Sequence, residues 1–342
     1  MRQLNQREQV VLNALIQHHI QTCQPVGSRQ LAKILDLGIS PATIRNVMMD
    51  LEDLGLITPP HKSAGRVPSD LGYRWYVDHL RQMMALSPTQ QDSIRQNMEP
   101  ITSNVDNLLQ TTSFVLGEIS HQIGMVLAPR LEKGICEKLQ LVELASNRIL
   151  LVMTFQAGVI KTLTMEITSE IPRLQLQATE QVLNERLAGL TLGEIRRSMS
   201  ERLKDVAPDN DHLISVFLQT APELLAEPQG EDLHLGDFSH WVIQPEFEST
   251  ESLRQVLTLL SNKNMVADVM RQQSHPQETT VTIGQENPEE EVQSFSLVTS
   301  PYKMGDVVGI LGILGPKRME YSRIIPVVRS TAHILTDVLR VQ

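Results

Sequence analysis

The sequence predicts an α+β protein of more than one domain, and three observations support this class. The 342 residues are 41% hydrophobic and 20% charged, which suits a globular chain with several cores. Three short amphipathic helical segments followed by a short basic hairpin fill residues 1–82. Beyond residue 100, strand patterns occur on both sides of a long block with helical periodicity. A single antiparallel-rich sheet, interrupted by a mainly helical insertion, accounts for this order.

Residues 1–82 predict a helix-turn-helix followed by a hairpin. The expected elements are helices over 5–21, from Ser28 to Leu35 and over 41–54, and strands that begin at Leu56 and Val67. Gly38 supplies the turn before the third helix. Ser40 is placed to cap that helix and Pro41 to occupy its first position. Gly55 has the position and chemistry of the residue that ends it.

The third helix carries the residue types that read bases. Placing Ile44, Met48 and Leu51 inward leaves five residues on the opposite side, at about 100° per residue: Ala42, Arg45, Asn46, Met49 and Asp53. Arginine suits bidentate contact with guanine, and asparagine suits adenine. Acidic residues crowd the C-terminal half, whereas a helix N-terminus attracts phosphate. We therefore expect the helix to enter the major groove with its N-terminal end first.

The hairpin tip adds basic and hydrogen-bonding side chains around Gly65, which permits a tight or positive-φ turn. Lys62 and Arg66 are suited to contact phosphates or to probe a minor groove. Three helices with such a hairpin at this distance indicate a winged helix-turn-helix that binds double-stranded DNA. The candidate DNA-binding residues are Ser40, Ala42, Thr43, Arg45, Asn46, His61, Lys62, Ser63 and Arg66.

Charge and cysteine content constrain the setting. The net charge is −10, but residues 1–82 hold nine Lys or Arg and seven Asp or Glu, so they carry +2 and the remainder −12. This division fits a small DNA-binding head on an acidic body. The chain has no apolar run of about 18 residues and no signal-peptide pattern, so no membrane association is expected. Cys23 and Cys136 are the only cysteines, which favours a reduced, cytoplasmic setting.

Beyond the head, residues 83–100 are predicted as a linker, and the polar stretch that Pro88 and Pro100 bracket within it is interpreted as a linker or a short helix. The later elements are expected as a helix over 101–123, strands over 138–145, 148–155 and 158–166, helices over 178–187, 192–203, 212–225 and 253–260, a link over 261–264, strands over 279–283, 294–299 and 306–314, and a helix over 321–341. The first and last of these helices are expected to cover one face of the sheet. The acidic run 286–291 is expected to be a solvated loop.

Enzyme chemistry finds little support. The chain has no Gly-Lys-Ser/Thr phosphate loop, and no Cys or His group has zinc-site spacing. Gly309, Gly312 and Gly315 recur every three residues, but their order is not a dinucleotide fingerprint. We therefore predict no catalytic residue, no metal and no cofactor.

Five segments resemble the HrcA family of bacterial heat-inducible transcription repressors. They are PVGSR at 25–29, SPATIRN at 40–46, SAGR at 63–66, GYR at 72–74 and GILGPKRMEYSRIIP at 312–326. The resemblance implies a winged-helix domain over 1–82, a GAF-like domain in two parts over 101–169 and 236–342, and an inserted dimerising domain over 170–235. It also implies that a homodimer represses chaperone operons at the inverted-repeat CIRCE operator, with activity dependent on the GroE chaperonin.

The chain departs from the family pattern in the wing, where Pro59 stands in place of a usual Gln. A proline cannot donate a ladder hydrogen bond, so we expect a shortened wing strand. Two alternatives remain open. One is a metabolite-responsive transcription regulator that senses a small ligand through the GAF-like domain. The other is a winged-helix protein that uses its head only for protein contacts.

Overall fold

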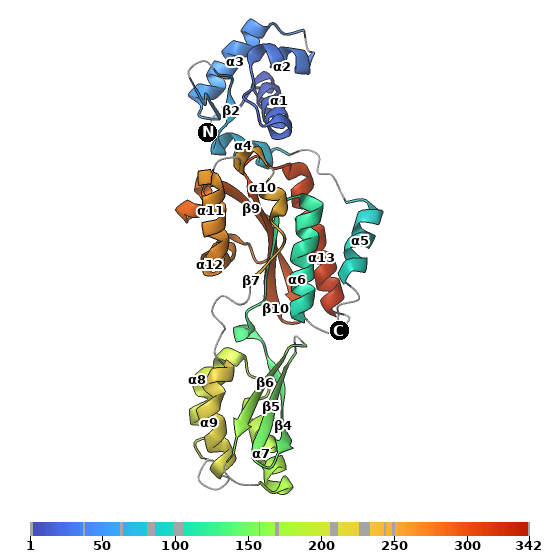
Figure 1. The fold of residues 1–342 in the computed structure, drawn as a ribbon, viewed down its shortest axis with the longest axis vertical. Coiled ribbons are helices and arrows are strands. Elements are labelled where there is room, and N and C mark those ends of the chain that lie inside the picture. The colour runs from blue at the N-terminus through green and yellow to red at the C-terminus, as the bar shows by residue number, and fades with distance from the viewer. Residues whose placement is uncertain are drawn as a thin grey trace. The chain divides into compact units, whose positions relative to one another are not determined.

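The computed structural model describes residues 3–36, 38–61, 64–80, 86–98, 105–156, 158–167, 171–205, 211–225, 233–242, 244–247 and 250–340. The chain divides into two compact units. The first comprises residues 1–127, 233–301 and 310–334, and the second comprises residues 128–232, 302–309 and 335–342. Figure 1 shows the order of the elements along the chain.

The head, residues 3–80, is a winged helix as predicted. Its elements are α1 (Gln6–Thr22), α2 (Ser28–Leu35), α3 (Pro41–Asp53), β1 (Ile57–Thr58), β2 (Val67–Pro68) and α4 (Asp70–Asp78). The helices enclose a core in which Val11, Leu15, Leu31, Ile44 and Leu51 are fully buried. The wing strands pair antiparallel, with Ile57 opposite Pro68. Strand β1 ends directly before Pro59, so the predicted shortening is confirmed.

Both ends of α3 are fixed by local chemistry. The Ser40 Oγ accepts a hydrogen bond from the Thr43 amide at 3.2 Å, and Pro41 is the first helical residue. At the other end, Gly55 has φ +72°, and its amide donates to the Glu52 carbonyl while the Leu56 amide donates to Leu51. This pair of bonds is the Schellman arrangement that ends helices. The direction of α3 is therefore set by its own sequence.

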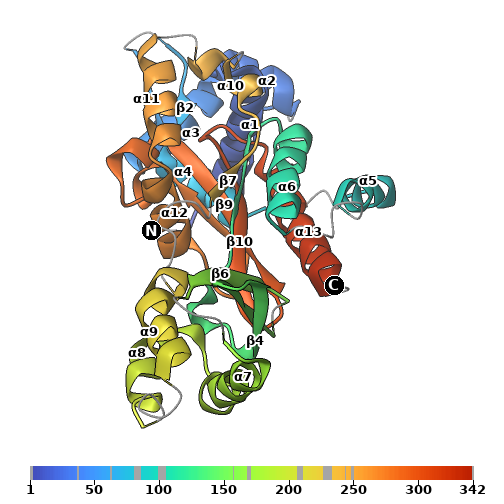
Figure 2. The same ribbon diagram turned by 60° about the horizontal axis from the view of Figure 1, so that its bottom comes forward.

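A five-stranded sheet forms the centre of the first unit, in the order β7-β3-β10-β9-β8. The strands are β3 (Ile123–Leu127), β7 (Leu233–Leu235), β8 (Thr280–Ile283), β9 (Phe295–Met304) and β10 (Val307–Pro316). Helices α6 (Val105–Ser120) and α13 (Tyr321–Arg340) lie beside each other on one face, as predicted, and α11 (Thr250–Ser261) and α12 (Lys263–Gln273) lie on the other (Figures 1 and 2).

The second unit contains its own antiparallel sheet, β4 (Cys136–Ala145), β5 (Arg148–Phe155) and β6 (Ile160–Glu166). One face packs against α7 (Arg173–Leu187), α8 (Leu192–Arg202) and α9 (Asp211–Leu225). The prediction of one sheet shared by all the strands is therefore wrong. Short turns let consecutive strands pair locally, which removes the need for distant partners. The boundary predicted at residue 170 falls inside this unit.

Side chains of α7 occupy the outer edge of β4. The side-chain oxygen of Asn184 accepts a hydrogen bond from the backbone amide of Leu139 at 2.9 Å, and its side-chain nitrogen donates to the Leu139 carbonyl at 2.7 Å. The Glu180 carboxylate accepts from the Leu141 amide at 2.9 Å. These bonds satisfy backbone groups that an open sheet edge would offer to another strand.

Other segments differ from prediction. The helix expected over 101–123 ends at Ser120; His121 has φ +55°, and β3 follows, while residues 101–104 lie outside the described residues. The expected link over 261–264 contains the start of α12. Within residues 83–100, the short-helix interpretation of the polar stretch is confirmed, since α5 spans Pro88–Met98.

The remaining short elements are η2 (Leu131–Lys133), α10 (Ser239–Val242), η3 (Pro245–Phe247), η4 (Gly284–Glu286) and η5 (Glu290–Val292). Helices η4 and η5 overlap the acidic run 286–291, which was expected to be a solvated loop. Asn287, which lies between these two helices, is buried. Within the described part of the chain, no helix has the length and apolar character needed to cross a membrane.

Candidate nucleic-acid interface

The exposed side of α3 carries the predicted base-reading residues. Ala42, Arg45 and Asn46 are exposed, whereas Ile44 and Leu51 are fully buried. Among the described residues, the Arg45 guanidinium has no ion-pair partner. A guanidinium without an internal partner is free to make bidentate contacts with an external acceptor.

Ser40 and Thr43 serve the helix itself. Their hydroxyl oxygens lie 2.9 Å apart, and the Ser40 hydroxyl also caps the helix through the Thr43 amide. Ser40 is exposed and Thr43 is half-buried. Both stand at the N-terminal end of α3, where unpaired amides and the helix dipole favour a phosphate.

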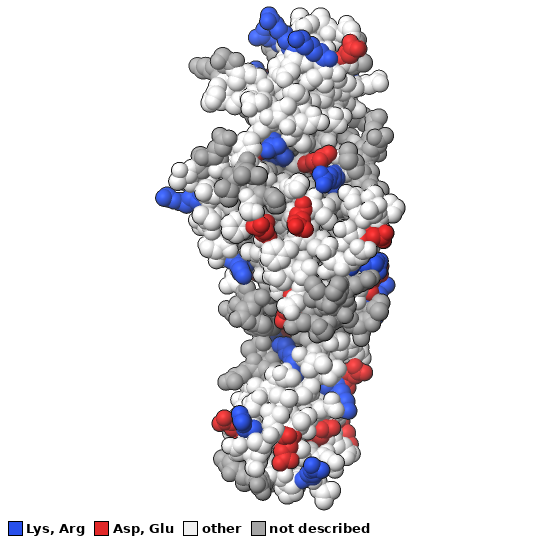
Figure 3. All heavy atoms as spheres, turned by 45° about the vertical axis from the view of Figure 1, so that its right-hand side comes forward, with Lys and Arg blue, Asp and Glu red and all other residues white. Residues whose placement is uncertain are grey.

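Basic side chains surround the N-terminal half of α3. Arg29 and Lys33 on α2 are exposed, as is Arg45. Figure 3 shows lysine and arginine side chains gathered at the end of the head that carries α2 and α3. Asp50 and Asp53, in contrast, are exposed toward the C-terminal end of α3. This charge gradient along the helix supports entry into a groove by its N-terminal end.

A groove of about 840 Å³ separates the beginning of α1 from α3. Thr43, Asn46 and Asp50 line one side, and Arg7 lines the other. Arg7 stands far from α3 in the sequence, so periodicity within α3 gave no indication of it. The groove therefore places Arg7 near the candidate residues Thr43 and Asn46.

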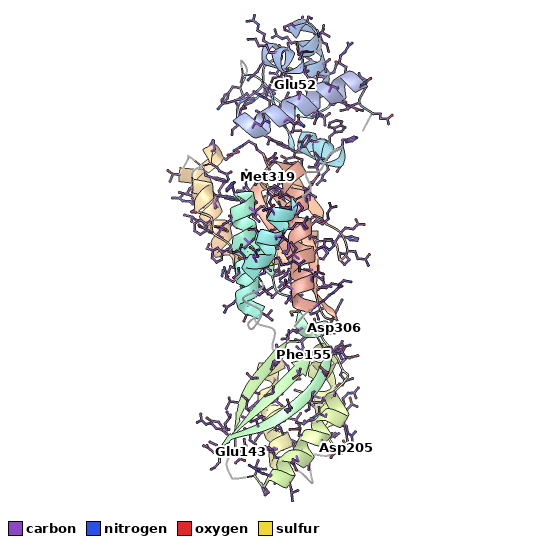
Figure 4. The ribbon with its side chains drawn as sticks, turned by 90° about the vertical axis from the view of Figure 1, so that its right-hand side faces the viewer. Glu52, Glu143, Phe155, Asp205, Asp306 and Met319 are labelled. Carbon is purple, nitrogen blue, oxygen red and sulfur yellow. The ribbon has the colours of Figure 1, made fainter. Side chains whose placement is uncertain are left out.

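Arg66 lies against α3, a placement that the sequence did not predict. Its Nε donates to the Glu52 carboxylate at 2.7 Å, and its Nη1 donates to the Ala64 carbonyl at 3.3 Å. Its side chain is only 25% exposed. The Arg66 backbone also pairs with Val26 through two hydrogen bonds of 2.9 Å. Arg66 therefore tethers the wing to α3, with Glu52, labelled in Figure 4, as its partner.

The structure gives Gly65 a role besides the predicted tight or positive-φ turn. Gly65 is absent from the described glycines with positive φ. A Cβ at this position would lie 2.7 Å from the backbone of Val26, which no real Cβ tolerates. Gly65 therefore permits the close approach of two backbone segments. At the tip itself, His61 is exposed, whereas Lys62 and Ser63 lie outside the described residues.

Mutation tests whether the ion pair between Arg66 and Glu52 holds the wing against α3. Arg66→Ala is expected to weaken DNA binding and to lower head stability by about 1 kcal/mol, since it removes a partly buried ion pair. The slope of log affinity against log salt should stay unchanged, because no phosphate contact is lost. Glu52→Gln, which breaks the same ion pair from its other side, should reproduce the loss of stability.

The control is Lys62→Ala, which we expect to lower the salt slope by about one unit through loss of a phosphate contact. Titrations at several salt concentrations measure both variants on the same duplex. A reduced slope for Arg66→Ala would show that Arg66 contacts phosphate and would contradict the tether.

Helix α4 joins the head to the sheet of the first unit. Arg74 pairs with Glu286 at 2.5 Å and donates to the Val281 carbonyl, and Asp70 pairs with Lys317 at 2.7 Å. The hydrogen bonds that Arg74 donates to the Glu286 carboxylate raise the pKa of Arg74. Glu286, predicted to be solvated, thus has a structural role. A head held in this way presents α3 in a fixed orientation within the first unit.

A second set of bonds adds to this junction. Arg318 donates to both oxygens of Glu246 and, at 2.8 Å, to the carbonyl of Ile20 at the end of α1. Burial acts to raise the pKa of Glu246, but the hydrogen bond and charge of Arg318 outweigh it, so the pKa is lowered. The ionised pair is therefore retained at neutral pH.

Cavities near the sheet bear on the ligand-sensing alternative. The cavity between the sheet and α11 and α12, lined by Met125, Leu259 and Val266 among others, measures about 10 Å³. This volume holds about one water molecule, so the core offers no room for a metabolite there. Among the described residues, no group of three or more His, Cys, Asp or Glu side chains is arranged to hold a metal.

Comparison with known proteins identifies related sequences over the full length. A model of the winged helix-turn-helix HrcA DNA-binding domain matches residues 3–75, and a model of the HrcA C-terminal domain matches residues 106–325. The heat-inducible transcription repressor HrcA of Chlorobium chlorochromatii is 39% identical, covering 100% of this chain and 99% of its own. That of Pelotomaculum thermopropionicum is 33% identical, covering 98% and 97%.

A solved crystal structure shares the fold. It is described as a hypothetical protein and aligns with a TM-score of 0.66 at 21% identity, covering 98% of this chain and 99% of its own.

Proposed function

The chain belongs to the HrcA family of heat-inducible transcription repressors, and from this we propose that it represses chaperone operons as a dimer on the inverted-repeat CIRCE operator. It is a DNA-binding regulator and not an enzyme. We place its action in the cytoplasm, where bacterial operator DNA is found. The proposal also includes dependence on the GroE chaperonin, as the family resemblance implies.

The observation that carries the proposal is the exposed face of α3. Arg45 and Asn46 project from a helix whose ends are fixed by the Ser40 cap and the Gly55 terminus. Fixed ends hold the backbone of α3 in one conformation, so the helix need not be ordered when the two side chains meet base edges. Arg45 is suited to guanine and Asn46 to adenine, while the amides at the start of α3 and the basic side chains of α2 bind phosphates.

Selection of bound duplexes from a random pool tests the proposal directly. We expect enrichment of an inverted repeat, because two identical heads related by a two-fold axis meet two identical half-sites. Enrichment of a single asymmetric site would contradict binding as a two-fold dimer. No enrichment at all would favour a head that contacts proteins only.

The outer face of the β4-β5-β6 sheet supports the proposed dimer. The inner face packs on helices, whereas the outer face exposes Val142 (45%) and Ile160 (60%). Val142 lies opposite the partly exposed Leu150 in the sheet register, so these two apolar residues adjoin on this face, and Ile160 lies opposite Thr154. Since α7 side chains occupy the β4 edge, a second copy would dock on this face rather than extend the sheet through β4.

Substitution on this face should dissociate the dimer. Val142→Asp and Ile160→Asp are each expected to raise the dimer dissociation constant a hundredfold or more, because an unpaired buried charge costs roughly 3–5 kcal/mol. Sedimentation over a range of concentrations measures the effect. Leu174→Asp, on α7 and 80% exposed, is the matched control and should stay dimeric. Dimers of unchanged affinity in both sheet variants would place the interface elsewhere.

A further inference from the structure

We propose that Met49 is a specificity-determining residue that selects thymine by contact with its C5-methyl group in the major groove. The inference rests on the proposed function and extends it, since Met49 lies outside the candidate residues found from the sequence. The apolar surface of the side chain and its place on α3 carry the argument.

Met49 differs from the other large apolar residues of α3. It is 56% exposed, whereas Val47 and Met48 are 8% and 6% exposed and Ile44 and Leu51 are fully buried. Single exposed apolar residues are common on protein surfaces, so exposure alone indicates nothing. The decisive observation is which face of the helix exposes this one.

Ala42, Arg45, Asn46 and Met49 follow the spacing i, i+3, i+4 and i+7, which places them on one face of α3. All four are exposed. Homeodomain recognition helices read the major groove with four residues at this same spacing, and the third of them is an asparagine that contacts adenine. Asn46 holds the corresponding place here, and Met49 is the fourth residue of the set.

The length of this face of α3 matches the width of the DNA major groove. The seven residue steps from Ala42 to Met49 span about 10 Å of helix, and the major groove is roughly 12 Å wide. The four residues therefore fit within the width of the groove, whereas Asp53 lies one further turn along the helix and Asp50 lines the neighbouring groove between α1 and α3.

The chemistry of Met49 identifies the base. A thioether is a poor hydrogen-bonding group, so it gains little from the polar edges of guanine, cytosine or adenine. The thymine C5-methyl is the apolar group that the major groove displays. The flexible, polarizable methionine side chain adapts its shape to such a contact.

Replacement of thymine by uracil removes only that methyl and provides the test. With the selected operator, each thymine of a half-site is changed to uracil in turn, and the affinity of the full-length protein is measured. The wild type should bind roughly fourfold more weakly at one or two positions, as expected for losing burial of one methyl-sized group. Met49→Ala should bind the thymine and uracil duplexes equally at those positions.

Two variants sharpen the result. Met49→Leu keeps an apolar side chain and should restore the preference for thymine. Leu71→Ala removes another exposed apolar side chain of the head, 54% exposed on α4, and should behave as wild type. Circular dichroism would verify that each variant is folded.

A wild type that binds thymine and uracil duplexes equally at every position overturns the inference, as does an Ala variant that keeps the wild-type preference. Failure of the wild type to select any duplex contradicts the proposed function itself, and the inference falls with it. These outcomes are distinguishable within one set of titrations.

Discussion

Arg45→Ala is expected to weaken operator binding by about 1–3 kcal/mol and to relax base preference at the positions that Arg45 reads. Asn46→Ala should have an effect of similar size at a different position. Both variants should remain folded, because each side chain is exposed on α3 and outside the buried stripe. Titration of each variant against the operator and its single-base variants measures the loss and locates it.

Arg45→Lys is the informative control. Lysine keeps the positive charge but cannot reproduce the planar, bidentate contact of a guanidinium. It should therefore retain affinity for random DNA while losing preference for the base that Arg45 contacts. Wild-type affinity and base preference in both alanine variants would remove α3 as the recognition element.

The head was predictable because its determinants are local. The N-cap at Ser40, the turn at Gly38 and the terminus at Gly55 each act within a few residues. The apolar period of α3 places Ile44 and Leu51 inward, which leaves Arg45 and Asn46 outward without reference to the rest of the fold.

The roles of Arg66 and Gly65 were not predictable from local pattern. Both depend on contacts with residues distant in the sequence, Glu52 for the Arg66 side chain and Val26 for the Gly65 backbone. A basic residue in a hairpin has the same sequence appearance whether it faces phosphate or an internal carboxylate. Tertiary approach decides between the two.

Strand β3 escaped prediction for a related reason. All five of its residues are buried, so it shows none of the alternation that marks a half-buried strand. Its apolar residues extend the helical pattern of α6, and only the left-handed conformation of His121 separates the two. Pairing of β3 with β10, far along the chain, then stabilises the strand.

The pairing of β3 with strands far along the chain leads to the prediction with the largest expected effect. We expect the protein to lose operator binding on mild heating and to regain that binding with the GroE chaperonin. Strand β3 pairs with β7 at Met125–Leu235 and with β10 at Ile313–Gly124. Residues 128–232, the largest part of the second unit, are synthesised between β3 and its partners. Pairings of such sequence separation form slowly and leave apolar strand edges exposed until they close.

We predict that heat acts on this protein through its folding rather than through release of a ligand. Protein diluted from denaturant should recover operator binding severalfold more completely with chaperonin and ATP than alone, since enclosure prevents association of exposed edges. Chaperonin without ATP is the control and should retain the chain without restoring binding. A gel-shift titration on one operator reports active protein in all three reactions. Equal recovery in each would count against chaperonin dependence, while leaving DNA recognition by α3 intact.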